Sequence, residues 1–239
     1  TAYDSYMTRL ENAVKNMENT PDKIFSDAFR KALYEGHFRG RQFDEKILEE
    51  ISFEACSSVF RTRFADPGDL TFVFVGNTDA ETVRELAEIY IASVGSVKKW
   101  EKWADDGKRI SDKGSSTEIY KGTDDKSQVL MLMKGDCRDS AKTRIEIDAV
   151  SYILDIRLRE KIREEMGGTY SISAYPSFVQ IPDSKYMIYI MFGCDPERTD
   201  ELSKAVLEEI EKLKAEIAEK EEKIREIREE IENGIDKFD

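Results

Sequence analysis

The sequence predicts an α+β fold, in which an antiparallel-rich sheet has helices packed on one face and is preceded by a helical segment. Three observations lead to this prediction. Residues 1–65 show amphipathic helical patterns without a strand pattern, and runs of strand length appear only after residue 66. These runs alternate with helical stretches in the order β-α-β-β-α-β-β-α, and strands joined by short turns pair as antiparallel neighbours.

Three helices are expected within residues 1–65. Apolar residues from Tyr3 to Met17 mark the first, Pro21 stands at the start of the second, and residues 47–64 form the third. The loop before the third helix holds the only histidine of the chain, His37. This helical segment either ends a preceding domain or packs as an extra layer.

The main boundary is expected at the turn signal in residues 66–69, Asp-Pro-Gly-Asp. Residues 70–75, LTFVFV, then predict a strand buried on both faces, and a capping box at residues 78–81 begins a helix that ends near Gly95. Residues 96–116, which include Trp100, are polar and predict a connecting loop.

Further strands and the last helix follow. We expect residues 118–121 to pair with residues 129–134, and residues 186–194 to form the last strand. Asp195 followed by proline is a strong helix start. The final helix carries a heptad pattern, Leu213, Ile217, Ile224, Ile227 and Ile231, with Lys220 in one apolar position. Its first half is expected on the sheet and its second half in solvent.

The stretch from residue 145 to residue 177 is the centre of this organisation. Apolar residues Ile145, Ala149, Ile153 and Ile156 and the segment 158–162 predict the buried face of a long helix. Two glycines then stop the helix, and residues 170–175 alternate between apolar and polar as in a half-buried strand. The stretch is therefore expected to form a helix, a glycine turn and a strand that returns over the helix.

Composition excludes several classes of function. The 239 residues carry a net charge of -13, which disfavours nucleic acid and anionic membrane as partners. No apolar run of membrane-spanning length occurs, and the three cysteines fit no metal or disulfide pattern. The chain starts on Thr1 without a methionine, so we expect it to be a fragment of a longer polypeptide.

The residues by themselves do not describe a complete enzyme. A single histidine cannot supply H-x-x-E-H or H-E-x-x-H, so no metal site is expected in this segment. No nucleophile elbow, P-loop or dinucleotide fingerprint occurs, and no carboxylate pair stands out from the charged helix faces. His37 is expected to be a surface residue rather than a catalyst.

Several segments, in their order and spacing, resemble the C-terminal region of the pitrilysin/insulinase family of inverzincin zinc metallopeptidases. The most specific are the strand-VGN-helix opening at residues 72–86 and LREKIREEMGGTY at residues 158–170. The nearest branch is the bacterial periplasmic zinc proteases of the PQQ-processing-like group. The chain departs from this pattern where the last helix lacks the Gly-Pro break expected of relatives.

The resemblance implies a fold and a role. Family enzymes have two halves of similar α+β domains that close around a peptide, with zinc held by the first domain. Residues 1–65 would end the preceding domain, and residues 66–239 would form the C-terminal, substrate-binding, non-zinc domain. Arg163 and Tyr170 match the family's arginine and tyrosine that reach the active site from the last domain, and Gly167 and Gly168 would support the turn between them.

The implied function is the C-terminal half-module of a zinc metalloendopeptidase, not active alone. It would close a chamber and bind peptide, with the N-terminal zinc half supplied by the same polypeptide or by a partner subunit. The cofactor, zinc, would be present only in the full-length protein. The resemblance favours the periplasm or cell envelope and leaves a cytoplasmic location open.

Two alternatives stay open. The chain could be a non-catalytic scaffold subunit of the same fold, or a binding domain whose terminal helix pairs with another protein. The residues alone favour structural roles for the two candidate site residues, with Arg163 in a helix C-terminal contact and Tyr170 in the core.

Overall fold

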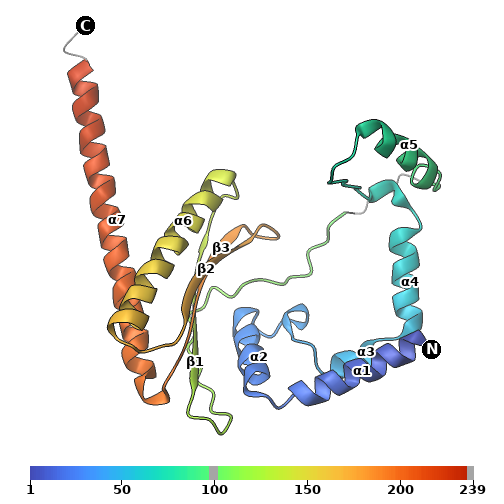
Figure 1. Cartoon of the computed structure of the whole chain (residues 1–239), viewed down its shortest axis with the longest axis horizontal. Helices are drawn as coiled ribbons and strands as arrows, with labels where there is room; N and C mark the ends of the chain where they lie inside the picture. The colour runs from blue at the N-terminus through green and yellow to red at the C-terminus, as the bar shows by residue number, and fades with distance from the viewer. Residues whose placement is uncertain (97–101, 236–239) are drawn as a thin grey trace. The chain divides into compact units, whose positions relative to one another are not determined.

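The computed structural model describes residues 1–96 and 102–235, and contacts divide the chain into two compact units (Figure 1). The first unit is Thr1–Gly122 and the second is Thr123–Asp239. The boundary predicted at residues 65 and 66 falls inside the first unit, and the division into family domains stays a prediction. Trp100 and the adjoining part of the predicted loop lie outside the described residues.

The first unit is helical where the sequence predicts helices. Its helices are α1 (Ala2–Met17), α2 (Pro21–Leu33), α3 (Glu45–Glu50), α4 (Phe53–Phe64) and α5 (Ala80–Tyr90), with 3-10 turns η1 (Phe38–Gly40) and η2 (Pro67–Asp69). The predicted third helix is two helices, because the Ser52 side chain accepts a hydrogen bond from the Ala55 N–H and so caps α4. Asp79 caps α5 in the same way.

The strands predicted at residues 70–75 and 118–121 are wrong. Both segments have no ladder pairing in the described structure, and their side chains are open, with Val75 93% and Tyr120 89% exposed. An apolar run becomes a strand only where a neighbouring backbone offers its N–H and C=O groups. Such a partner depends on contacts distant in sequence, which local composition does not specify.

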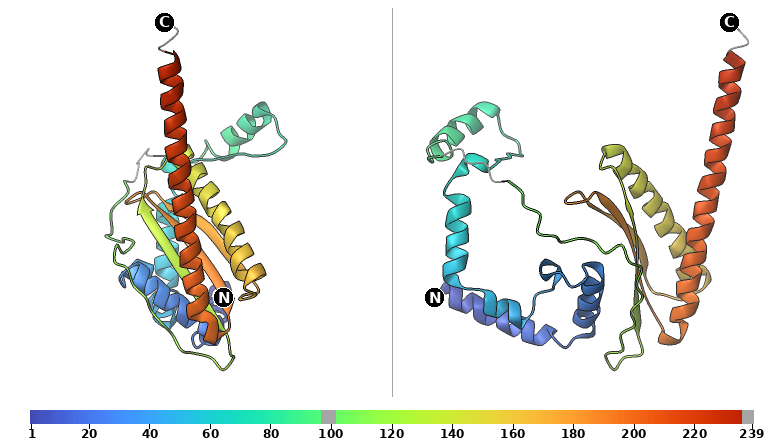
Figure 2. Two further views of the ribbon diagram at one scale, coloured as in Figure 1. Left: turned by 90° about the vertical axis from the view of Figure 1, so that its left-hand side faces the viewer. Right: turned by 180° about the vertical axis from the view of Figure 1, so that it is seen from behind.

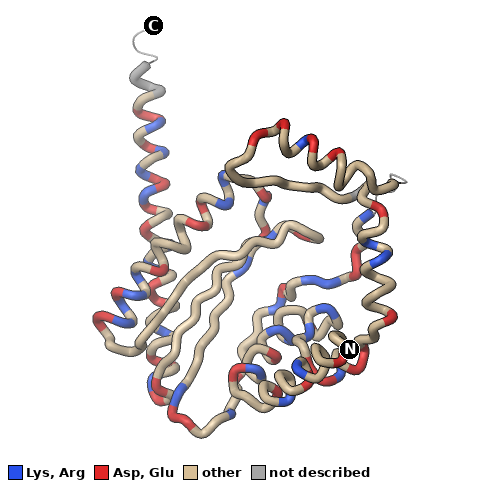
Figure 3. The backbone as a smooth tube through the Cα atoms, turned by 45° about the vertical axis from the view of Figure 1, so that its right-hand side comes forward, with Lys and Arg blue, Asp and Glu red and all other residues tan. Residues whose placement is uncertain are grey.

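The second unit contains a three-stranded antiparallel sheet in the order β1-β3-β2. The strands are β1 (Ser127–Asp136), β2 (Ile172–Val179) and β3 (Lys185–Cys194), so both strands expected after the glycine turn are confirmed. Register places Ile190 of β3 opposite Met131 of β1 and Ala174 of β2. The segment at residues 129–134 thus pairs with β3 and not with residues 118–121. The strands carry few charges compared with the helices (Figure 3).

Helices α6 (Ala141–Leu158) and α7 (Thr199–Ile235) cover one face of this sheet, as the fold class predicts (Figures 1 and 2). Alternate residues of β2 and β3 point toward them, and only the first half of α7 takes part. The buried cluster consists of Leu154, Leu158, Ile162, Ile172, Ala174, Ile188, Ile190, Phe192, Leu202, Val206, Ile210 and Leu213. Burial of this apolar surface is the main driving force for the unit.

The buried face of α6 matches the prediction only at its C-terminal end, where Leu158 is buried and is followed by the buried Ile162 of the next turn. Ser151, Leu154 and Leu158 are buried, whereas Ile145 is 68% and Ile153 is 45% exposed. Apolar side chains occur on two sides of this helix, so periodicity alone does not identify the side that meets the sheet.

Strand β2 is a protected edge of the sheet. The Asp155 carboxylate of α6 accepts a hydrogen bond of 2.9 Å from the Ala174 N–H, which therefore points away from β3. Pro176, two residues later on the same side, has no N–H to offer. These two features block pairing of another strand at this edge.

Candidate functional site

The chain after α6 forms a widened helical turn that leads into the candidate site. Residues Arg159–Glu165 form a π-helix, η3, and the Met166 N–H donates to the Lys161 carbonyl five residues earlier at 3.1 Å. Ile162 is fully buried in this turn. Single π turns of this kind are frequent at functional sites.

Two glycines end the helix for different physical reasons. Gly167 has a φ of 57°, a left-handed conformation that costs an L side chain energy. Gly168 has too little space, because an added Cβ would lie 2.3 Å from Leu202 Cδ2 on α7. The N–H groups of Gly167 and Gly168 donate to the carbonyls of Arg163 and Ile162 at 3.1 and 2.9 Å.

Two further side chains hold this turn, and the sequence reasoning did not identify either. Arg198, in η4 (Pro196–Arg198), donates from both terminal nitrogens to the Met166 carbonyl at 3.3 Å. The Thr169 hydroxyl lies 2.5 Å from the Gly193 carbonyl of β3. Each contact crosses at least 24 residues of sequence, so no local pattern points to it.

The Arg198 guanidinium is itself fixed. It donates to the Glu201 carboxylate through two nitrogens at 3.1 Å each. The hydrogen bond from Arg198 lowers the pKa of Glu201, and the same bond raises the pKa of Arg198. The turn therefore rests on a charged pair at the start of α7.

Arg163 and Tyr170 lie at the two ends of this turn, and both side chains are open. Tyr170 is 94% exposed, and Arg163 has a side chain 49% exposed whose Nε lies 3.5 Å from the Glu164 carboxylate. Within the described part of the chain no hydrogen bond joins Arg163 to Tyr170. A guanidinium and a phenol are thus presented from a braced turn without being paired with each other.

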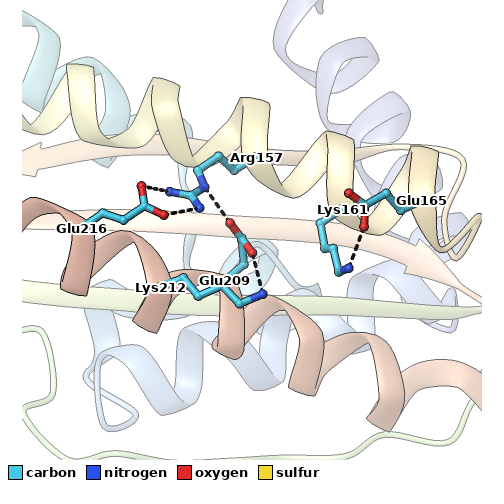
Figure 4. Close-up of polar contacts among 6 residues, drawn as sticks. All are labelled: Arg157, Lys161, Glu165, Glu209, Lys212 and Glu216. Carbon is cyan, nitrogen blue, oxygen red and sulfur yellow. Dashed lines mark hydrogen bonds and ion pairs between the residues drawn. The ribbon is translucent and has the colours of Figure 1, made fainter.

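A partly buried ion-pair cluster anchors α6 to α7 beside the turn (Figure 4). Arg157 donates to Glu209 at 2.6 Å and to both oxygens of Glu216 at 2.8 Å, and Lys212 lies 3.4 Å from Glu209. Glu209 is only 6% exposed. Hydrogen bonding to Glu216 raises the pKa of Arg157, and the same bonds lower the pKa of Glu216.

The π turn carries a second ion pair (Figure 4). Lys161 donates to Glu165 at 2.6 Å, which raises the pKa of the lysine and lowers the pKa of the glutamate. Arg159 pairs with Asp155, the residue that also holds β2. Lys161, Glu165 and Arg159 are therefore each paired with a residue four positions away along the helix.

The sheet face opposite α6 and α7 is lined by aromatic and thioether side chains. Tyr175 and Tyr189, opposite each other in register, stack with ring centroids 5.3 Å apart and planes 9° apart. The Tyr175 hydroxyl lies 3.3 Å from the Met191 sulfur. Aromatic rings and thioethers make apolar contacts that suit peptide side chains of varied shape.

The described residues do not offer a metal site. No group of three or more His, Cys, Asp or Glu side chains is arranged to hold an ion in residues 1–96 and 102–235. His37 lies in the first unit, where its Nδ1 accepts from the Arg39 N–H and its Nε2 is 3.0 Å from the Asp106 carbonyl. Nor does any helix of the described part have the length and apolarity needed to cross a membrane.

Comparison with known proteins finds curated relatives that are named as probable zinc proteases. The sequence is 29% identical over 211 residues to the probable zinc protease PqqL of Escherichia coli, covering 84% of this chain and 22% of that protein. The Haemophilus influenzae PqqL is 24% identical over 165 residues, covering 67% of this chain and 17% of the relative. The chain therefore spans about a fifth of the curated relatives.

Solved structures of zinc-protease relatives have a similar fold. The crystal structure of the periplasmic protease PqqL from Escherichia coli matches with a TM-score of 0.76 and 25% identity, over 90% of this chain and 24% of that one. The ferredoxin protease FusC, solved as a mutant in complex with Arabidopsis ferredoxin, shares the fold with a TM-score of 0.68 and 16% identity, over 87% of this chain and 22% of that one.

A family model described as the peptidase M16 inactive domain matches residues 59–230, which is more than half of the chain. This range contains the sheet, the π turn, the paired glycines and both candidate site residues. The α+β fold, the relatives and the matched segment agree with one another, and the chain accordingly belongs to the peptidase M16 family of zinc proteases, in which it corresponds to the inactive domain.

Proposed function

We propose that this chain is the non-zinc half-module of a zinc metalloendopeptidase. It closes the chamber over a peptide substrate, while hydrolysis takes place at a zinc site held by the N-terminal half, on the same polypeptide or on a partner subunit. The observation that carries the proposal is the braced turn, which presents Arg163 and Tyr170 seven residues apart with both side chains open.

The chemistry of the two residues fits this role. Attack on a peptide carbonyl places negative charge on its oxygen, and a preorganised donor aimed at that oxygen lowers the barrier. Arg163 brings a permanent charge with several N–H donors, and Tyr170 brings one hydroxyl donor. Donors act best when their backbone does not move, which is what the contacts of Gly168, Thr169 and Arg198 provide.

Substrate is proposed to be an extended peptide or an unfolded protein segment. The relative FusC was solved with a protein, ferredoxin, which supports a polypeptide as the molecule that is bound. In this chain the aromatic sheet face around Tyr175 and Tyr189 supplies apolar contact for a peptide. We place the protein in the periplasm, by analogy with the periplasmic protease PqqL of Escherichia coli.

The test uses the chain together with the zinc-binding half of its own polypeptide. We expect hydrolysis of a quenched fluorescent peptide only when both halves are present. Arg163→Ala and Tyr170→Phe should each reduce kcat by about 10²-fold or more, the magnitude for loss of one preformed donor. Arg163→Lys should recover only part of the activity, because an ammonium lacks the planar fork of donors.

Arg138→Ala and Tyr152→Phe are the matched controls, since both residues are exposed in the same unit and lie outside the turn. Their kcat should stay at the wild-type value. Equal activity of Arg163→Ala and Arg138→Ala would remove the transition-state role. If the joined halves hydrolyse nothing, the chain is instead a scaffold of the same fold, without a peptidase function.

A further inference from the structure

The second half of α7 carries an apolar stripe that its own unit leaves uncovered. Upstream, Val206, Ile210 and Leu213 of the same stripe are buried against the sheet, and Ile217 is half-buried. Beyond this point Ile224, Ile227 and Ile231 are 50%, 55% and 56% exposed. The helix continues past the sheet and α6, as Figures 1 and 2 show.

The stripe has the spacing of a coiled coil. Ile217, Ile224 and Ile231 stand seven residues apart, and Lys220 and Ile227 occupy the positions three residues after the first two. In heptad terms these are the a and d positions. The e positions next to the stripe are Glu221 and Arg228, and the g positions are Glu216, Lys223 and Glu230, which mix both signs of charge along the helix (Figure 3).

We infer that α7 pairs with α7 of a second copy of this chain as an antiparallel two-helix coiled coil. The register is the one that places Ile224 of one copy opposite Ile227 of the other, and Ile231 opposite Lys220. The lysine stems then cover the outer isoleucines at both ends while their ammonium groups reach water.

Charge selects this arrangement over the others. In antiparallel pairs, e faces e and g faces g. Glu221 therefore meets Arg228 of the second copy, and Lys223 meets Glu230, which gives four attractive contacts by symmetry. A parallel pair would instead place Glu216 beside Glu221 and Lys223 beside Arg228, which repel.

The antiparallel register is also specific. If the pairing shifted by one heptad toward the sheet, Glu221 would meet Glu221 of the second copy, and the two like charges would repel. The opposite shift would bring Arg228 against Arg228 of the second copy, with the same effect. The pair is short, with about 18 residues of overlap at a rise of 1.5 Å per residue. We expect a weak dimer that dissociates on dilution, with the two sheets at opposite ends.

Sedimentation velocity of the 239-residue chain between roughly 10 and 500 µM measures the self-association. The expected result is a monomer–dimer equilibrium that Ile224→Lys with Ile227→Lys weakens by about 100-fold or more, since the central apolar layers are lost. Circular dichroism checks that these exposed changes leave the fold intact. A monomer at every concentration, or a dimer unaffected by the double variant, overturns the inference.

Charge reversal tests the direction of the helices. Glu221→Lys turns two attractive antiparallel contacts into repulsive ones and should weaken the dimer by roughly fivefold. Adding Arg228→Glu should restore the wild-type affinity, because the two signs are then exchanged. In a parallel pair Glu221 does not face Arg228, so Glu221→Lys would not weaken association, and that result would overturn the antiparallel arrangement.

Discussion

Gly168 is a position where a single added methyl group should destabilise the second unit. We expect Gly168→Ala to lower the free energy of unfolding of the second unit by about 1–3 kcal/mol, because its Cβ would overlap the buried Leu202 side chain. Hydrogen exchange of the β3 amides measures this free energy in the intact chain.

Two further variants separate overlap from backbone strain. Gly167→Ala meets no atom within 4 Å and should cost about 1 kcal/mol, from its left-handed φ alone. Combining Gly168→Ala with Leu202→Ala should cost less than the sum of the two single changes, because the shorter side chain relieves the overlap. Simple additivity would show that Gly168 is not required for its close approach to α7.

Arg157 and Glu209 form the ion pair whose removal has a predictable sign. Arg157→Met leaves the Glu209 carboxylate buried with Lys212 as its ion-pair partner, and should destabilise the second unit by about 2–4 kcal/mol. The double variant Arg157→Met with Glu209→Leu should regain most of this loss, because two apolar side chains fill the site. Hydrogen exchange of the β3 amides measures the stability of both variants. A double variant no more stable than Arg157→Met alone would contradict this explanation of the ion pair.

Glu216 makes part of this anchor dependent on pH. Its pKa is lowered in the folded state by the hydrogen bonds from Arg157, so its contribution to stability is present above the unfolded pKa, about 4.3. The contribution is lost as pH falls through the lower folded pKa. The stability difference between wild type and Glu216→Gln should therefore shrink as pH is taken from 7 to about 3 in thermal unfolding. A difference that grows toward acid would contradict the assignment.

At the scale of elements, the glycine turn is a unit that the sequence identified only in part. The stop at Gly167 and Gly168 and the strand after it were predictable, because paired glycines and alternating residues are local signals. The contacts of Arg198 and Thr169 were not, because they join residues at least 24 positions apart, and the π form of η3 was not predicted either. Alternation predicted Tyr170 on the buried side, yet it precedes β2 and is exposed.

The two long helices show the same limit. The first half of α7 lies on the sheet and its second half is exposed, as its heptad pattern and charge indicated. For α6, burial of Leu158 was predicted correctly, but the stripe through Ile145 and Ile153 was the wrong choice, because the helix has a second apolar side that includes Leu154. Only packing against β2 and α7 selects between two such faces.

At the scale of the whole molecule, the second unit has a sheet, two covering helices and a core of its own. We therefore expect residues 123–239, expressed alone, to retain the hydrogen-exchange protection of the β3 amides seen in the complete chain. A fragment of residues 66–239 is the matched comparison. Protection present in 66–239 but lost in 123–239 would contradict this independence and favour the boundary predicted at residues 65 and 66.

Features that depend on near neighbours in sequence were determined by the sequence alone. These are the helices of the first unit apart from the break at Ser52, the helix start near Asp79, the glycine turn, the strands β2 and β3, and the absence of a histidine pair. The family also follows from such segments, because their order and spacing are specific even where each one is weak.

Tertiary structure decided which face of α6 is buried, which strands find partners and what braces the turn at Arg163. The reason is physical: an apolar side chain or an N–H group is stabilised by any suitable partner, so its own identity does not name that partner. Residues 70–75 and β1 are both apolar runs of strand length, yet only β1 lies beside β3. Contacts between residues distant in sequence make that distinction, and they exist only once the chain has folded.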